Sequence, residues 1–95
     1  MLFTSSARAQ LLGALDHVRS ESSSAAVAVL DRATVSLSRL RDFPESGRVV
    51  PEFPDLPYRE VLVAPYRFFY RVVVDTVWIV AVWRERQLPG KPECR

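Results

Sequence analysis

Four arginines in the C-terminal half of the chain are the residues best suited to chemistry. They are Arg59, Arg67, Arg71 and Arg84. A guanidinium stays protonated and offers a planar fork of donors, so it binds phosphate or carboxylate and can stabilise a phosphoryl transition state. For the same reason it is a poor general base. The arginines therefore predict a surface that binds anions.

Three segments rich in β-branched and aromatic residues carry these arginines and predict an antiparallel meander. The segments are YREVLVA (58–64), YRFFYRVVV (66–74) and TVWIVAVW (76–83). Side chains alternate between the two faces of a strand. A last hairpin that is symmetric about Asp75-Thr76 would therefore place Arg67 opposite Arg84.

The alternation predicts one uncharged face and one cationic face. The uncharged face would hold Tyr66, Phe68, Tyr70, Val72, Val74, Val77, Ile79, Ala81 and Trp83. The cationic face would hold Arg67, Phe69, Arg71, Val73, Trp78, Val80, Val82 and Arg84, joined by Arg59, Val61 and Val63. Opposed like charges destabilise a sheet. A bound anion or a base stacked on an aromatic ring would offset that cost.

A plainer interpretation of the same arginines is that they serve the fold. Their stems would cover apolar surface, and their heads would be solvated or paired with Glu52, Asp55 or Glu60. Both interpretations stay open at this point.

Two amphipathic helices precede the strands and predict a helical hairpin over about residues 5–42. Their stripes are Ala7, Leu11, Leu15 and Val18, then Ala26, Val29, Leu30, Ala33, Leu37 and Leu40. The predicted fold is α+β, in one domain over residues 1–95. A short N-terminal strand comes first, then the hairpin, then the meander over about 58–84 with the helices on its uncharged face, then a tail over 85–95.

Several kinds of site are not expected. With one cysteine, Cys94, one histidine, His17, and three glycines, the sequence lacks an internal disulfide, a metal-ligand pattern and a glycine-rich phosphate loop. His17 is expected on the polar side of the first helix. No signal peptide or membrane-length apolar run is seen, so we expect a cytoplasmic protein that binds no membrane and no cofactor.

Apolar positions on the predicted cationic face suggest a protein partner, because a chain of 95 residues is small for a self-sufficient core. The positions in question are Val61, Val63, Val80 and Val82. The alternative is that a loop, about residues 49–57, folds over them.

The order of three motifs resembles that of the RelE/ParE superfamily of bacterial toxins from type II toxin–antitoxin pairs. The motifs are LRDFPESGRVVPE (40–52), YREVLVAPYRFFYRV (58–72) and VWIVAVWRERQLP (77–89). The resemblance implies a growth inhibitor that a cognate antitoxin neutralises by wrapping it in a hetero-oligomer.

Two toxic activities are known in this superfamily. RelE-like members cleave mRNA on the ribosome through a basic sheet face, and the resemblance would then assign catalysis to Arg59, Arg67, Arg71, Arg84 and Glu85. ParE-like members poison DNA gyrase, and the contact residues would then be Arg59, Arg67, Arg71, Trp78, Arg84 and Arg86. A third possibility is a non-toxic binding module that retains the fold.

One departure from the superfamily favours gyrase as the target. Arg84 stands where many relatives in this subgroup have a histidine, in a tail that resembles W-H-G-A-Q-L-P. Without that histidine the chain loses a candidate acid or base, so the resemblance indicates the ParE-like activity.

Overall fold

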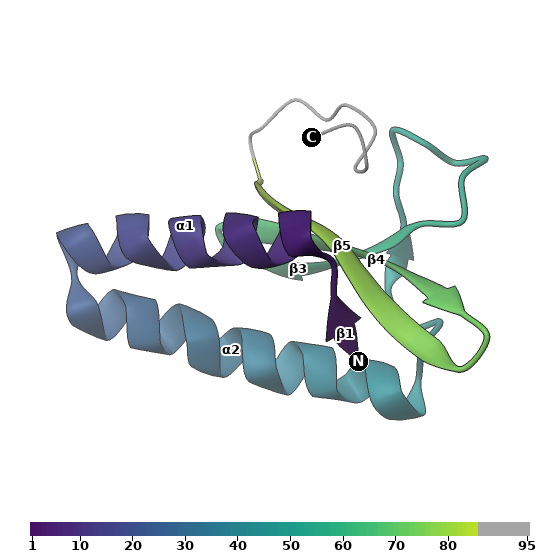
Figure 1. Ribbon diagram of the computed structural model, residues 1–95, viewed down its shortest axis with the longest axis horizontal. Coiled ribbons are helices and arrows are strands. Elements are labelled where there is room, and N and C mark those ends of the chain that lie inside the picture. Colours follow the sequence, from purple (N-terminus) through teal and green to yellow (C-terminus); the bar gives the residue numbers. More distant parts are fainter. Residues whose placement is uncertain (86–95) are drawn as a thin grey trace.

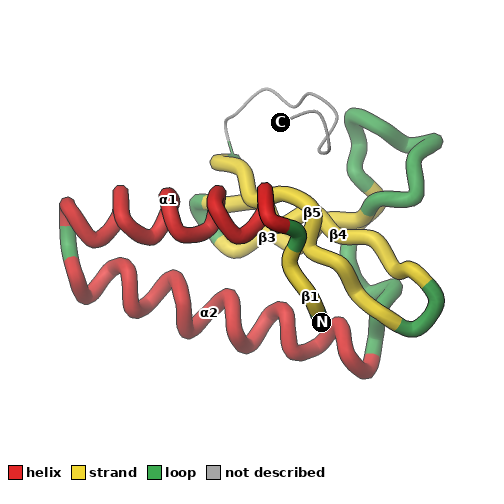
Figure 2. The backbone as a smooth tube through the Cα atoms, viewed as in Figure 1, coloured by secondary structure: helices red, strands yellow, loops and turns green. Residues whose placement is uncertain are grey.

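Two helices and five strands follow one another along residues 1–85, the part of the chain that the computed structural model describes (Figures 1 and 2). In chain order they are β1 (Leu2–Phe3), α1 (Ser5–Glu21), α2 (Ser23–Asp42), β2 (Arg48–Val49), β3 (Arg59–Val63), β4 (Tyr66–Val73) and β5 (Thr76–Arg84). The strands form one sheet in the order β1-β5-β4-β3-β2. β1 runs parallel to β5, and the other neighbours are antiparallel. The predicted α+β fold is confirmed, with β2 as a strand that the sequence pattern did not predict.

Hydroxyl side chains set where the two helices begin. Thr4 Oγ1 accepts a hydrogen bond from the Ala7 N–H at 3.1 Å, and Ser22 Oγ accepts one from the Ala25 N–H at 3.2 Å. Such caps satisfy backbone donors that a helix leaves unpaired. The Ser22 N–H also donates to the Val18 carbonyl at 2.8 Å, so one residue ends α1 and begins α2. The two helices therefore lie side by side and antiparallel (Figure 1).

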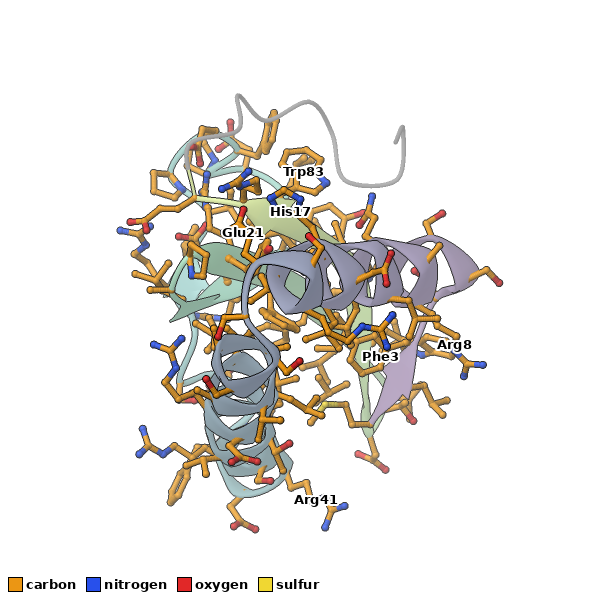
Figure 3. The ribbon with its side chains drawn as sticks, turned by 90° about the vertical axis from the view of Figure 1, so that its left-hand side faces the viewer. Phe3, Arg8, His17, Glu21, Arg41 and Trp83 are labelled. Carbon is orange, nitrogen blue, oxygen red and sulfur yellow. The ribbon has the colours of Figure 1, made fainter. Side chains whose placement is uncertain are left out.

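The apolar stripes of the helices cover one face of the sheet, here called the helix-covered face. Its buried core consists of Ala7, Val29, Ala33, Leu37, Leu40, Val63, Tyr66, Phe68, Tyr70, Val77, Ile79 and Val82. Phe3, labelled in Figure 3, packs against this core from β1. Burial of each large apolar side chain stabilises the fold by about 1.5–3 kcal/mol, so this cluster dominates stability.

The other face of the sheet is also buried, because the segment 50–57 folds over it. We call this the loop-covered face. Its core consists of Val50, Tyr58, Phe69, Val80, Ala81 and Trp83, with Phe53, Leu56 and Trp78 packed against it. The rings of Phe69 and Trp83 meet edge to face with their centroids 5.0 Å apart. The covering loop was the alternative to a partner at this face.

The expectation of exposed valines at a partner surface is therefore wrong. Val63, Val80 and Val82 are buried, and Val61 is half-buried. Val80 lies under the loop, whereas the other three pack on the helix-covered side. Two small cores thus sandwich the sheet.

The β4–β5 hairpin carries a bulge that the sequence pattern did not reveal. Its turn consists of Val74 and Asp75, because Val73 pairs with Thr76. The pairs on either side of the irregularity are Tyr70 with Ile79 and Phe69 with Ala81. Val80 is therefore an extra residue on β5. One extra residue inverts the alternation of every side chain beyond it.

The bulge places Arg67 and Arg84 on opposite faces, so the prediction that they face each other is wrong. Arg67 pairs with Trp83, and Arg84 pairs with Tyr66 on the helix-covered side. Three other side chains lie on the face opposite to the predicted one for the same reason: Ala81, Val82 and Trp83.

Strand β3 is also turned over relative to the prediction. The two-residue turn at Ala64-Pro65 pairs Val63 with Tyr66, and so Arg59 pairs with Tyr70 on the helix-covered side. The prediction that Arg67 shares its face with Arg59, Val61 and Val63 is therefore wrong. Glu60, opposite Phe69, takes that place on the loop-covered face.

Candidate functional site

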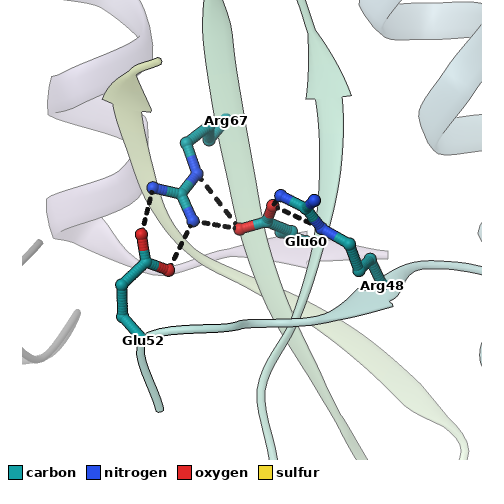
Figure 4. Close-up of polar contacts among 4 residues, drawn as sticks. All are labelled: Arg48, Glu52, Glu60 and Arg67. Carbon is teal, nitrogen blue, oxygen red and sulfur yellow. Dashed lines mark hydrogen bonds and ion pairs between the residues drawn. The ribbon is translucent and has the colours of Figure 1, made fainter. Parts of the chain in front are cut away.

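The Arg67 guanidinium is held between two carboxylates at the loop-covered face (Figure 4). It makes a bidentate pair with Glu52, at 3.1 Å and 2.8 Å, and bonds Glu60 Oε1 through Nε at 3.1 Å and Nη2 at 2.5 Å. Arg48 bonds the other oxygen of Glu60. The guanidinium also lies 4.9 Å from the centroid of the Phe69 ring. These four charged residues form one network with no net charge.

Burial makes this network structural. Arg67 is 6% exposed and Glu60 3% exposed, and charges that leave water must be paired. The hydrogen bond from Arg67 lowers the pKa of Glu52, against a smaller opposing effect of burial. The same contact with Glu52 raises the pKa of Arg67. The arginine ties strands β3 and β4 to the covering loop, and its donors are not directed to solvent.

Arg59 supports a tight turn on the other side of the sheet. Its Nη1 donates to the Gly47 carbonyl at 2.9 Å. The buried Tyr70 hydroxyl donates to the Pro44 carbonyl at 2.7 Å and accepts from the Gly47 N–H at 2.9 Å. Desolvation raises the pKa of Tyr70. The P-x-x-G-R motif is thus a structural turn.

Arg71 and Trp78 lie on one face, as the alternation predicts, and the observed register also makes them neighbours. They pair across β4 and β5 on the loop-covered face, and each is half-buried. The Arg71 guanidinium lies 5.8 Å from the centroid of the Tyr58 ring. Its Nε is buried without a hydrogen-bond partner among residues 1–85. This pair keeps a cation beside aromatic surface.

Arg84 lies in a different cleft, of about 270 Å³, between α1 and the end of β5. Gln10, His17 and Tyr66 also line it. The Tyr66 hydroxyl donates to the Ala14 carbonyl at 3.3 Å. His17, labelled in Figure 3, has its Nε2 3.4 Å from Glu21 Oε1. Sequence reasoning missed this cleft, although Gln10, Ala14 and His17 follow helical spacing. Only the bulge turns Arg84 toward them.

The remaining predicted site residues are at the end of the described chain. Glu85 is exposed, and its N–H donates to the Pro65 carbonyl at 2.8 Å. Arg86 and Cys94 lie outside the described residues.

Neither of the two helices in residues 1–85 combines the length and the apolar character that a membrane span requires. In the same range no group of three or more His, Cys, Asp or Glu side chains could hold a metal ion.

The order of strand, helical hairpin and meander defines a small α+β protein with a five-stranded mixed sheet. A family described as "ParE toxin of type II toxin-antitoxin system, parDE" matches residues 1–89. The chain belongs to this family and hence to the RelE/ParE superfamily, whose toxins pair with a cognate antitoxin. A search of curated proteins finds no match.

Proposed function

We propose that the chain is a ParE-like toxin that inhibits cell growth by binding DNA gyrase, without a catalytic step of its own. Its cognate antitoxin would neutralise it in a hetero-oligomeric complex. The match to the ParE toxin family over residues 1–89 supports this assignment.

One observation carries the proposal: the arginines predicted to share one exposed face do not form such a face. A ribonuclease that works through a basic sheet face needs several cations free to grip one phosphate. Here Arg67 is buried between carboxylates, while Arg59 and Arg84 belong to the other side of the sheet. The residues expected to act together are therefore dispersed.

Two of the predicted contact arginines remain proposed contacts with the target. Arg71, beside Trp78, combines a cation with aromatic surface, and Arg84 is exposed at the end of β5. Arg67 and Arg59 would act on the target only indirectly, by holding the fold. Arg86 remains a proposed contact on the basis of the family resemblance alone.

The proposal is tested by supercoiling assays with purified toxin and DNA gyrase. We expect loss of supercoiling or accumulation of cleaved DNA, and reversal by the antitoxin. Primer extension on translating ribosomes is the matched control, in which we expect no codon-positioned cuts. An unaffected gyrase at micromolar excess of toxin would refute the proposal.

The cleft beside α1 favours one alternative, a ribosome-dependent mRNA endonuclease. It brings His17, Tyr66 and Arg84 to one hollow, so it places a cation beside a histidine, an acid–base group that the loop-covered face lacks. His17→Ala would abolish mRNA cleavage under this alternative and leave gyrase inhibition intact under the first. Unimpaired growth on induction without antitoxin would instead indicate a non-toxic module.

A further inference from the structure

The β4–β5 turn presents a valine in an unfavourable backbone conformation. Val74 has φ 56° and is 89% exposed. Positive φ is uncommon outside glycine, asparagine and aspartate, and it strains the backbone of a β-branched residue. No packing contact compensates, because the side chain is almost entirely in solvent. The fold alone therefore gives no reason for valine here.

Apolar side chains surround this turn on both faces. Val72 and Val73 are each exposed, and Phe43, at the end of α2, is 66% exposed. Phe43 and Val72 line one hollow of about 550 Å³. Figure 1 shows the turn at the opposite end of the molecule from the α1–α2 junction. The hairpin tip, here residues 72–75 with Phe43, thus offers an apolar projection.

Carboxylates give this hollow a negative charge, opposite in sign to the net charge of the chain. Asp42 and Glu45 line it, and no basic residue does. Neither forms an ion pair within residues 1–85, and the same holds for Asp75 at the turn. The whole chain carries a net charge of +2. An acidic hollow on a basic protein selects a partner of opposite charge.

We propose that the hairpin tip is a contact surface for the toxin's target, and that it receives an apolar side chain flanked by lysine or arginine on a gyrase subunit. The inference rests on the proposed function and extends it by naming the surface and the chemistry of the partner. Strain at Val74 is then kept because the valine supplies contact area. Function-linked strain of this kind trades stability for activity.

The test replaces Val74 with asparagine, which tolerates positive φ and removes the apolar group. We expect Val74→Asn to raise the melting temperature while the toxin concentration that half-inhibits supercoiling rises at least tenfold. Val35→Asn is the matched control, because Val35 is an exposed valine at 59% on α2. It should leave inhibition unchanged.

Charge is tested separately with Glu45→Lys and, as control, Asp31→Lys on α2. The first should weaken inhibition several-fold and the second should not. A more stable Val74→Asn toxin that inhibits gyrase like wild type would overturn the inference while leaving the proposed function intact. Wild-type toxin that fails to inhibit gyrase would remove both. Loss of antitoxin binding with retained inhibition would also overturn it, by assigning the tip to the antitoxin.

Discussion

Arg67 illustrates how a cation on a strand can be part of the core. Its guanidinium bonds Glu52 and Glu60 and stacks near Phe69, so its charge is matched before any ligand arrives. Removing one member of such a buried pair leaves the other uncompensated.

We predict that Arg67→Ala lowers the free energy of unfolding by about 3 kcal/mol, because Glu60 loses its buried partner. Urea denaturation of the purified chain measures this. Arg8→Ala is the control: Arg8 is exposed, and its loss should change stability by no more than about 0.5 kcal/mol. An Arg67→Ala protein as stable as wild type would count against the structural role.

At the two glycines of the described chain, replacement by alanine should change stability in opposite directions. A Cβ on Gly47 would lie 2.4 Å from the buried Tyr70 hydroxyl and 2.9 Å from the Glu60 carbonyl oxygen. Gly13 has no atom within 4 Å of that position. Gly47→Ala should therefore destabilise by about 1–3 kcal/mol, whereas Gly13→Ala in α1 should stabilise by about 1 kcal/mol. Thermal melts of the pair check this; equal shifts would contradict the packing described around Tyr70.

At the scale of elements, the helix junction depends on one hydroxyl. Ser22→Ala removes the bond to the Ala25 N–H and should cost about 1 kcal/mol. Ser23→Ala, one residue along and exposed, should be nearly neutral. Chemical denaturation distinguishes the two, and an equal loss in both would show that Ser22 is not the effective cap.

The covering loop should loosen in acid. The hydrogen bond from Arg67 holds the pKa of Glu52 below its ordinary value of 4.5. A lowered folded-state pKa gives stability that is present above the unfolded pKa and lost as pH falls through the folded one. The free energy of unfolding should therefore decline below about pH 4.5. In Glu52→Gln this part of the decline should disappear, and an unchanged pH profile in that variant would refute the link.

The helices were predictable and the strand faces were not, for a physical reason. Helical stripes such as Val29, Ala33 and Leu37 repeat with the period of the helix and need no partner to be seen. Strand faces depend on register, and both faces of this sheet are apolar, so Val80 looks the same whether it is regular or bulged. One such residue was enough to separate Arg84 from Arg67.

On the scale of the molecule, the order of elements could be predicted because composition changes sharply between the helical and strand halves. The second core was only one of two alternatives, since prolines interrupt the apolar residues Val50, Phe53 and Leu56 of segment 50–57, and nothing local says which face they cover. The same uncertainty applies to the candidate site. The carboxylates were expected to pair with arginines, but the register of the strands decides which arginine they bury.

The central claim is that the arginine network serves the fold and that toxicity is exerted elsewhere. It is tested most directly by the double variant Arg67→Met with Glu60→Leu, since apolar residues often replace a buried ion pair without loss of stability. Growth is measured after induction without antitoxin, with a thermal melt to confirm folding. We predict growth arrest equal to that of the wild-type toxin, whereas a folded double variant that permits normal growth would contradict the claim.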